Sequence, residues 1–403
     1  DSNVILTAAG NTSIVNDTTL NLEGTVTGTL DAEATTGGIT DSGALSVTGN
    51  ATFNDAAQAS VTLDTLQADS NVILTAAGNT SIVNDTALNL EGTVTGTLNA
   101  EATTGGITDS GTLAITGATT LNSGAGNITL DEAASTFGQL LITGADVSIV
   151  ENAAMDLGAS TISGTADFNS TGNAITDSGT LAITGATTLN SGAGNITLDE
   201  TASTFGQLLI TGADVSIVEN AAMDLGASTI SGTADFNSSG NAITDSGTLA
   251  ITGATTLNSG AGNITLDETA STFGQLLITG ADVSIVENAA MDLGASTISG
   301  TADFNSTGNA ITDSGTLAIT GATTLNSGAG NITLDETAST FGQLLITGAD
   351  VSIVENAAMD LGASTISGTA DFNSTGNAIT DSGTLAITGA TTLNSGAGNI
   401  TLD

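Results

Sequence analysis

The sequence predicts an all-β fold, a parallel β-helix (β-solenoid) that we expect to be right-handed. The first observation is a 68-residue repeat, since the stretch GTLAITGATTLNSGAGNITLD begins at Gly111, Gly179, Gly247, Gly315 and Gly383. The second is that short runs rich in Ile, Leu, Val and Thr alternate with Gly, Ala, Asn and Ser, which is typical of short strands between turns. The third is the lack of long apolar runs with the period of a helix.

Each 68-residue unit contains a shorter theme, an apolar residue followed by Thr or Ser, Gly and a small residue. The theme begins at Ile183, Ile210 and Ile230, and it returns at Ile251, where the next unit repeats the first of these positions. We therefore expect about three turns of the solenoid per 68-residue repeat, each turn stacked on the one before it.

Three β-type runs can be marked in every predicted turn. In order along residues 181–245, the first turn contains LAIT, TTLN and NITLD, the second LLIT, VSIV and AMDLG, and the third STIS, ADFN and NAITD. These runs are rich in β-branched residues, and the Gly and Asn residues between them suit the corners. The prediction is thus three short strands per turn, arranged in three sheets.

We predict one continuous repeat array with no separate globular domain. A single turn of roughly 22 residues loses more backbone entropy on folding than its few inward side chains return on burial, so turns must stack to be stable. Because the chain begins and ends within a repeat, we expect it to be a segment of a longer polypeptide. The predicted copies are 1–68, 69–136, 137–204, 205–272, 273–340 and 341–403.

The composition excludes several classes of partner and site. The 403 residues contain 42 Asp and Glu but no Lys, Arg or His, which gives a formal net charge of −42. Nucleic acid is excluded because phosphate binding needs Lys or Arg, and an anionic membrane surface would repel the chain. No apolar run approaches the roughly 18 residues of a spanning helix, so we expect no membrane insertion by this segment. Without Cys there are no disulfides, thiol nucleophiles or thiolate metal sites.

Carboxylates are the one chemical feature that recurs with the repeat. One Asp per turn follows the Ile of the theme at a nearly constant separation along the chain, which predicts a row of Asp residues along the stack. With turns about 4.8 Å apart, neighbouring carboxylates would repel by roughly 3.5 kcal/mol at an effective dielectric constant of 20, and cations would relieve this repulsion. Ca²⁺ suits such oxygen ligands but the established calcium-loop motifs are missing, so defined Ca²⁺ sites and diffuse Na⁺ or Mg²⁺ both stay open. The candidate metal residues are Asp199, Asp224, Asp245, Asp267, Asp292 and Asp313.

Two alternatives to a structural role are disfavoured. No catalytic residue is expected, because pairs such as Asp199 and Glu200 recur in several copies and no Lys, Arg or His is available to bind an anionic substrate or activate a nucleophile. An ice-binding face would need paired hydroxyl rows, whereas the row of Thr184, Thr211 and Ser231 has no regular second row beside it.

The theme Ile183-Thr184-Gly185-Ala186, its short turns and strands rich in Gly, Asn, Thr and Ser resemble the β-helical shafts of filamentous-haemagglutinin-like adhesins and large bacterial surface proteins. The resemblance covers the whole chain at the level of pattern. It implies secretion, an extracellular or cell-surface location, and a role in adhesion or matrix formation.

We therefore predict a structural extracellular β-solenoid fibre of a prokaryotic surface, stabilised by cations and self-associating through them into fibres or bundles. The alternative is the shaft of an adhesin or surface-layer protein whose binding domain lies outside this segment. Contacts with a cell surface or a polysaccharide are compatible with either function.

Overall fold

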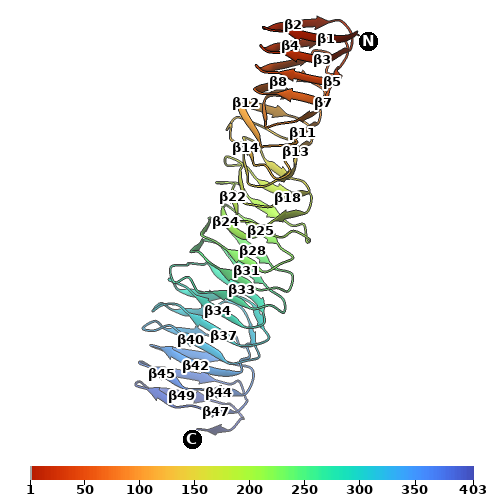
Figure 1. Ribbon diagram of the computed structural model, residues 1–403. Coiled ribbons are helices and arrows are strands. Elements are labelled where there is room, and N and C mark those ends of the chain that lie inside the picture. The colour runs from red at the N-terminus through yellow and green to blue at the C-terminus, as the bar shows by residue number, and fades with distance from the viewer. Residues whose placement is uncertain (1) are drawn as a thin grey trace. The chain divides into compact units, whose positions relative to one another are not determined.

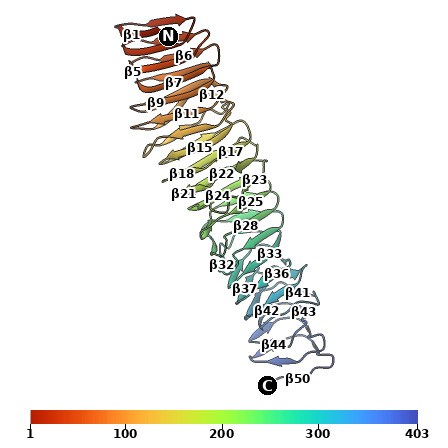
Figure 2. The same ribbon diagram turned by 90° about the vertical axis from the view of Figure 1, so that its right-hand side faces the viewer.

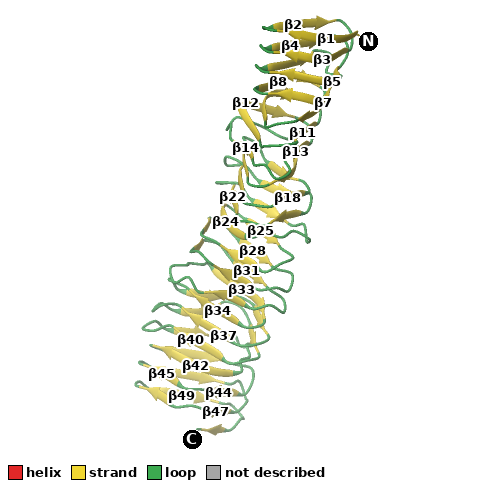
Figure 3. Ribbon diagram, viewed as in Figure 1, coloured by secondary structure: helices red, strands yellow, loops and turns green. Residues whose placement is uncertain are grey.

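The computed structural model describes residues 2–403, which form two compact units divided between Gly206 and Gln207. The regular structure of these residues consists of β-strands, and the strands pair in parallel (Figure 3). The predicted parallel β-solenoid is therefore confirmed, while its handedness stays a prediction. No helix among residues 2–403 has the length and apolar character needed to cross a membrane.

The segment 2–115 contains the longer strands. They are β1 (Ser2–Ala8), β2 (Thr12–Asn16), β3 (Leu20–Val26), β4 (Leu30–Ala34), β5 (Ile39–Val47), β6 (Ala51–Asp55), β7 (Ser60–Ala68), β8 (Asn71–Ala77), β9 (Asn79–Asn84), β10 (Leu88–Val94), β11 (Leu98–Ala102) and β12 (Ile107–Ile115).

From β13 onward the strands are shorter and repeat strictly: the strand nine labels later is the same segment in the next 68-residue copy, up to β50 (Ile400–Thr401), which is one residue shorter. The nine strands that recur are β13 (Thr119–Asn122), β14 (Ile128–Leu130), β15 (Gln139–Gly144), β16 (Val147–Val150), β17 (Met155–Leu157), β18 (Ser160–Ile162), β19 (Ala166–Asn169), β20 (Ile175–Asp177) and β21 (Leu181–Ile183).

Each coil contributes one strand position to each of two sheets, rather than to the three that we predicted. In unit 1, β1 pairs with β3 and β2 with β4, and Figure 2 shows β5, β7, β9 and β11 following one another in one sheet. The runs LAIT, TTLN and NITLD are β21, β22 (Thr187–Asn190) and β23 (Ile196–Leu198), and β23 returns to the sheet that holds β21. The third run thus begins the next coil, because a period of two identifies strands but does not say which strands pair.

The prediction of three turns per repeat is also corrected. Thr255 and Thr391 occupy the same position two copies apart, and seven successive parallel pairings in unit 2 connect them. One 68-residue copy therefore makes three and a half coils. The theme undercounts the coils because it is missing from the coil that separates Thr119 from Leu140.

A half-integral number of coils places successive copies of one segment in opposite sheets. The segment TTLN forms β31 (Thr255–Asn258), β40 (Thr323–Asn326) and β49 (Thr391–Asn394) in unit 2 (Figure 1). β31 and β49 belong to one sheet, and β40 belongs to the other. Every chemical feature of the copy is therefore presented by the two sheets in turn.

The core consists of inward side chains that stack from coil to coil. Along one such row, Leu130, Ile149, Phe168 and Leu189 pair in succession, and all four side chains are buried. Burial of each such side chain contributes roughly 1.5–3 kcal/mol, and stacking covers each residue from both sides along the solenoid. Side chains on the other face of each strand are exposed or half-buried, so carboxylates can follow the same strands on the outside.

Candidate functional site

One aspartate in each copy accepts hydrogen bonds from the backbone of the next coil, and we call it the bracket aspartate. In unit 1, Asp177 Oδ1 accepts a 2.9 Å bond from the N–H of Asp199, and its Oδ2 accepts a 3.3 Å bond from the N–H of Glu200. In unit 2, Asp313 makes the same pair of bonds, at 2.8 and 3.4 Å. The six bracket aspartates are Asp41, Asp109, Asp177, Asp245, Asp313 and Asp381.

The position of the bracket aspartate explains these bonds. Asp177 is the last residue of β20, and the N–H groups of Asp199 and Glu200 follow the end of β23 in the next coil. The strand ladder is interrupted here and resumes at Ala182 and Thr204, so in the gap a carboxylate takes the place of the carbonyl oxygens as acceptor for two backbone donors. The bracket therefore joins successive coils where backbone pairing is interrupted.

The pKa of the bracket aspartate Asp177 is raised above its ordinary value by causes that act in both directions. Burial raises the pKa of Asp177 above its ordinary value, the two backbone donors lower it, and the charges of Asp199 and Glu200 raise it again. The pKa of Asp313 is raised by the same causes, with Asp335 and Glu336 as its acidic neighbours. A nearby cation would relieve this repulsion, which the chain itself cannot neutralise because it contains no basic residue.

A second set of polar contacts lies beside the bracket aspartate. Gln139 Nε2 donates a 2.7 Å hydrogen bond to Ser178 Oγ, which donates a 2.5 Å bond to Asp156 Oδ1. Gln139 and Asp156 are register partners in adjacent coils, and Ser178 lies one coil further on. The contact thus ties three successive coils together, and Gln275, Ser314 and Asp292 repeat it in unit 2.

The six predicted metal residues fall into three structural roles. Asp245 and Asp313 are bracket aspartates, Asp199 and Asp267 supply the backbone N–H to a bracket, and Asp224 and Asp292 accept a bond from a serine.

We predicted that these residues form one row along the stack, but the structure does not place them in one row. The register partner of Asp245 is Leu225 rather than Asp224, and residues one position apart on a strand point to opposite faces. The number of residues that separates each Asp from the Ile of the theme did not give the register, because the coils differ in length. Among the described residues, no three carboxylates come together in an arrangement that could hold a metal ion. The binding of Ca²⁺ at these residues stays a prediction.

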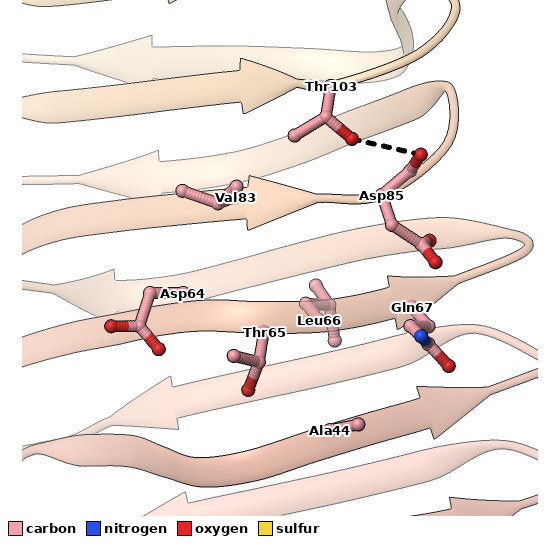
Figure 4. A pocket seen from close by; sticks show the side chains of 8 residues that line it. All are labelled: Ala44, Asp64, Thr65, Leu66, Gln67, Val83, Asp85 and Thr103. Carbon is pink, nitrogen blue, oxygen red and sulfur yellow. Dashed lines mark hydrogen bonds between the residues drawn. The ribbon is translucent and has the colours of Figure 1, made fainter.

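A hollow of about 320 Å³ lies beside the bracket of the divergent first copy in unit 1. Asp41 accepts bonds there from the N–H groups of Asp64 and Thr65, at 3.0 and 2.9 Å. Figure 4 shows Asp64, Thr65 and Gln67 along one strand, with Asp85 on the coil beyond. The hollow therefore presents two carboxylates and small polar groups beside a bracket aspartate.

Sequence reasoning missed two groups of residues. The first comprises Asp41, Asp109, Asp177 and Asp381, which the 68-residue spacing alone could have identified from Asp245 and Asp313. The second is a buried glutamate that follows the VSIV strand, at Glu151, Glu219, Glu287 and Glu355. The glutamate directly follows the run VSIV, in which inward and outward side chains alternate, and continuing this alternation predicts that the glutamate points inward.

A search of protein families matches almost the whole chain to six consecutive copies of one repeat model, described as repeats of unknown function. No curated protein and no solved structure matches the chain. The family copies begin seven or eight residues after those that we predicted, which is a difference of phase within the same period. The matched residues are 9–76, 77–143, 144–211, 212–279, 280–347 and 348–403. The chain thus belongs to the DUF5649 family of repeats of unknown function.

Proposed function

We propose that this chain is a structural thread, the β-solenoid of an extracellular fibre, sheath or matrix on a prokaryotic surface. The observation that carries the proposal is that backbone pairing crosses the copy boundaries without a break. In unit 2, β40 pairs with β42 (Gln343–Gly348) over four successive residues, although one strand precedes and the other follows the predicted boundary at residue 341. Each added copy therefore extends the same stack, which is what a structural thread requires.

The chemistry of the copy supports a structural role over a catalytic one. The bracket aspartates accept bonds from backbone N–H groups, Asp224 and its equivalents accept bonds from serine hydroxyls, and both contacts recur with the 68-residue period. A repeated acceptor stabilises a scaffold, whereas a catalytic centre is a local exception to its scaffold. We therefore propose no enzymatic activity for this segment.

The resemblance to filamentous-haemagglutinin-like shafts supports the extracellular location. A surface that carries only negative charge keeps identical threads apart until cations bridge them, so we propose self-association through cations such as Ca²⁺.

The test compares the full chain with a version that carries two further 68-residue copies inserted within the array. Small-angle X-ray scattering should show that the maximum dimension grows by about 17 Å per copy, for three and a half coils at roughly 4.8 Å each. Copies that fold as separate compact bodies on flexible links would give no such constant increment. Immunogold labelling of intact source cells should place the protein outside the cell, and labelling only after lysis would contradict the location.

A further inference from the structure

A glutamate is enclosed in the interior of the solenoid without a charged partner. Glu287 follows β34 (Val283–Val286), and its side chain is completely buried. Its Oε1 accepts a 2.8 Å hydrogen bond from the backbone N–H of Phe273, and its Oε2 is buried with no hydrogen-bond partner. Glu151 in unit 1 and Glu355 in unit 2 have the same burial, the same single bond and the same unpartnered oxygen.

The surroundings hold this residue in place from two directions. On one side lies the loop between β32 (Ile264–Leu266) and β33 (Gln275–Gly280), in which Phe273 is buried and Ser271 accepts a 2.8 Å bond from the N–H of Asn288. On the other side, Thr307 Oγ1 donates a 3.0 Å bond to the backbone oxygen of Glu287. The backbone around Glu287 is therefore held by both the preceding and the following coil, and its carboxyl group by the N–H of Phe273 in the preceding coil.

No group in the chain could neutralise an ionised carboxylate at this position, because Lys, Arg and His are missing from the sequence. The titratable groups on the elements packed against Glu287 are Asp267 and Glu268 of the loop and Asp303 of β37 (Ala302–Asn305). All three are acids with exposed or half-buried side chains, so their charges can only oppose ionisation of Glu287.

We propose that the buried glutamate is a proton-binding site, present once in each of the four copies that contain Glu151, Glu219, Glu287 and Glu355, so that folding of the array takes up protons. Burial, opposed by the Phe273 N–H, raises the pKa of Glu287 to about 7, and the pKa values of Glu151 and Glu355 are raised to about 7 for the same reason. The inference is independent of the proposed structural function, because it concerns the stability of the solenoid wherever the protein resides.

The sign of the effect follows from linkage. An exposed glutamate in the unfolded chain ionises near pH 4.5, whereas the buried glutamate keeps its proton up to about pH 7. The stabilisation is therefore complete below pH 4.5, is lost progressively as the pH rises to about 7, and does not change further above that. Within this window each buried glutamate changes the unfolding equilibrium constant by up to about tenfold per pH unit.

The test uses the full chain and replaces all four buried glutamates by glutamine, which keeps the acceptor for the Phe N–H and carries no charge. The matched control replaces Glu132, Glu200, Glu268 and Glu336 by glutamine, which removes the same number of charges from more exposed positions. Denaturant unfolding is followed from pH 4.5 to 8. We expect the buried variant to lose most of the pH dependence of the wild type and to exceed its stability at pH 8, while the control keeps the wild-type slope.

A second measurement does not depend on how the variants fold. Infrared spectra of the folded wild type at pH 6 should contain the C=O stretch of a protonated carboxylic acid, and this band should disappear on titration above pH 7. A spectrum without the band, a buried variant with the wild-type slope, or a control that loses the slope would each overturn the proposal.

Discussion

The N–H of Gly321 donates a 2.7 Å hydrogen bond to the carbonyl oxygen of Gly300, one coil earlier, and a Cβ placed on Gly321 would lie 2.4 Å from that same oxygen. The close approach of the two backbones is thus possible only because residue 321 has no side chain. The oxygen belongs to the backbone and cannot move aside without breaking the bond.

We predict that Gly321→Ala destabilises the solenoid by roughly 1–3 kcal/mol, because the coil must shift to accommodate the methyl group. Gly10→Ala is the control, because a Cβ placed on Gly10 would meet no atom within 4 Å. Denaturant midpoints and amide hydrogen exchange of the neighbouring coils compare the two variants. Equal losses in both would contradict the argument.

Phe304 tests the stacked core. Its side chain is completely buried, and its register partners in the adjacent coils are Ile285 and Leu325. We expect Phe304→Ala to cost about 3–5 kcal/mol, because it leaves a cavity that the paired backbones cannot close, and Phe304→Leu to cost clearly less. Thermal and denaturant unfolding of the full chain measure the difference, and an alanine variant as stable as the leucine variant would show that the row is not tightly packed.

Asp313 tests the bracket. Asp313→Ala removes the acceptor for the N–H groups of Asp335 and Glu336, and we expect a loss of about 1 kcal/mol, reduced from the usual value for charged acceptors because the site is half-exposed. Amide exchange at residues 335 and 336 should accelerate. Asp335→Ala serves as the control, since it removes one charge beside Asp313 but leaves the two backbone bonds intact. Unchanged amide exchange at Glu336 in Asp313→Ala would show that the bracket aspartate does not stabilise the contact between the two coils.

Cation binding beside the bracket aspartates predicts a specific response to chelation. Removal of divalent ions with a chelator should lower the melting temperature, and Ca²⁺ but not an equal ionic strength of Na⁺ should restore it. A variant carrying Asp335→Asn and Glu336→Gln should respond less, because these two charges oppose ionisation of Asp313. Identical melting curves with chelator, Ca²⁺ and Na⁺ would remove defined calcium sites and leave only diffuse counterions.

The sequence predicted the strands well and their arrangement less well. Runs such as VSIV and ADFN were recognised, and the structure has them as β16 and β19, register partners one coil apart. That the strands of a coil form two sheets rather than three could not be read from the runs, because it depends on corners whose bend is decided by packing. Likewise, Asp224 and Asp245 were placed in one row by counting, whereas the pairing of Leu225 with Asp245 shifts them apart by one residue.

By itself, the sequence determined the all-β class, the 68-residue period, the inward rows of Ile, Leu and Val, and a surface without any positive charge. These properties follow from composition and local periodicity, which need no knowledge of distant neighbours. Only the tertiary structure decided that a copy makes three and a half coils, that Asp313 reaches the backbone of Asp335, and that Glu287 is sealed from water. The physical reason is that each of these depends on contacts between residues a coil apart along the chain, and the length and bend of every intervening corner set which residues meet.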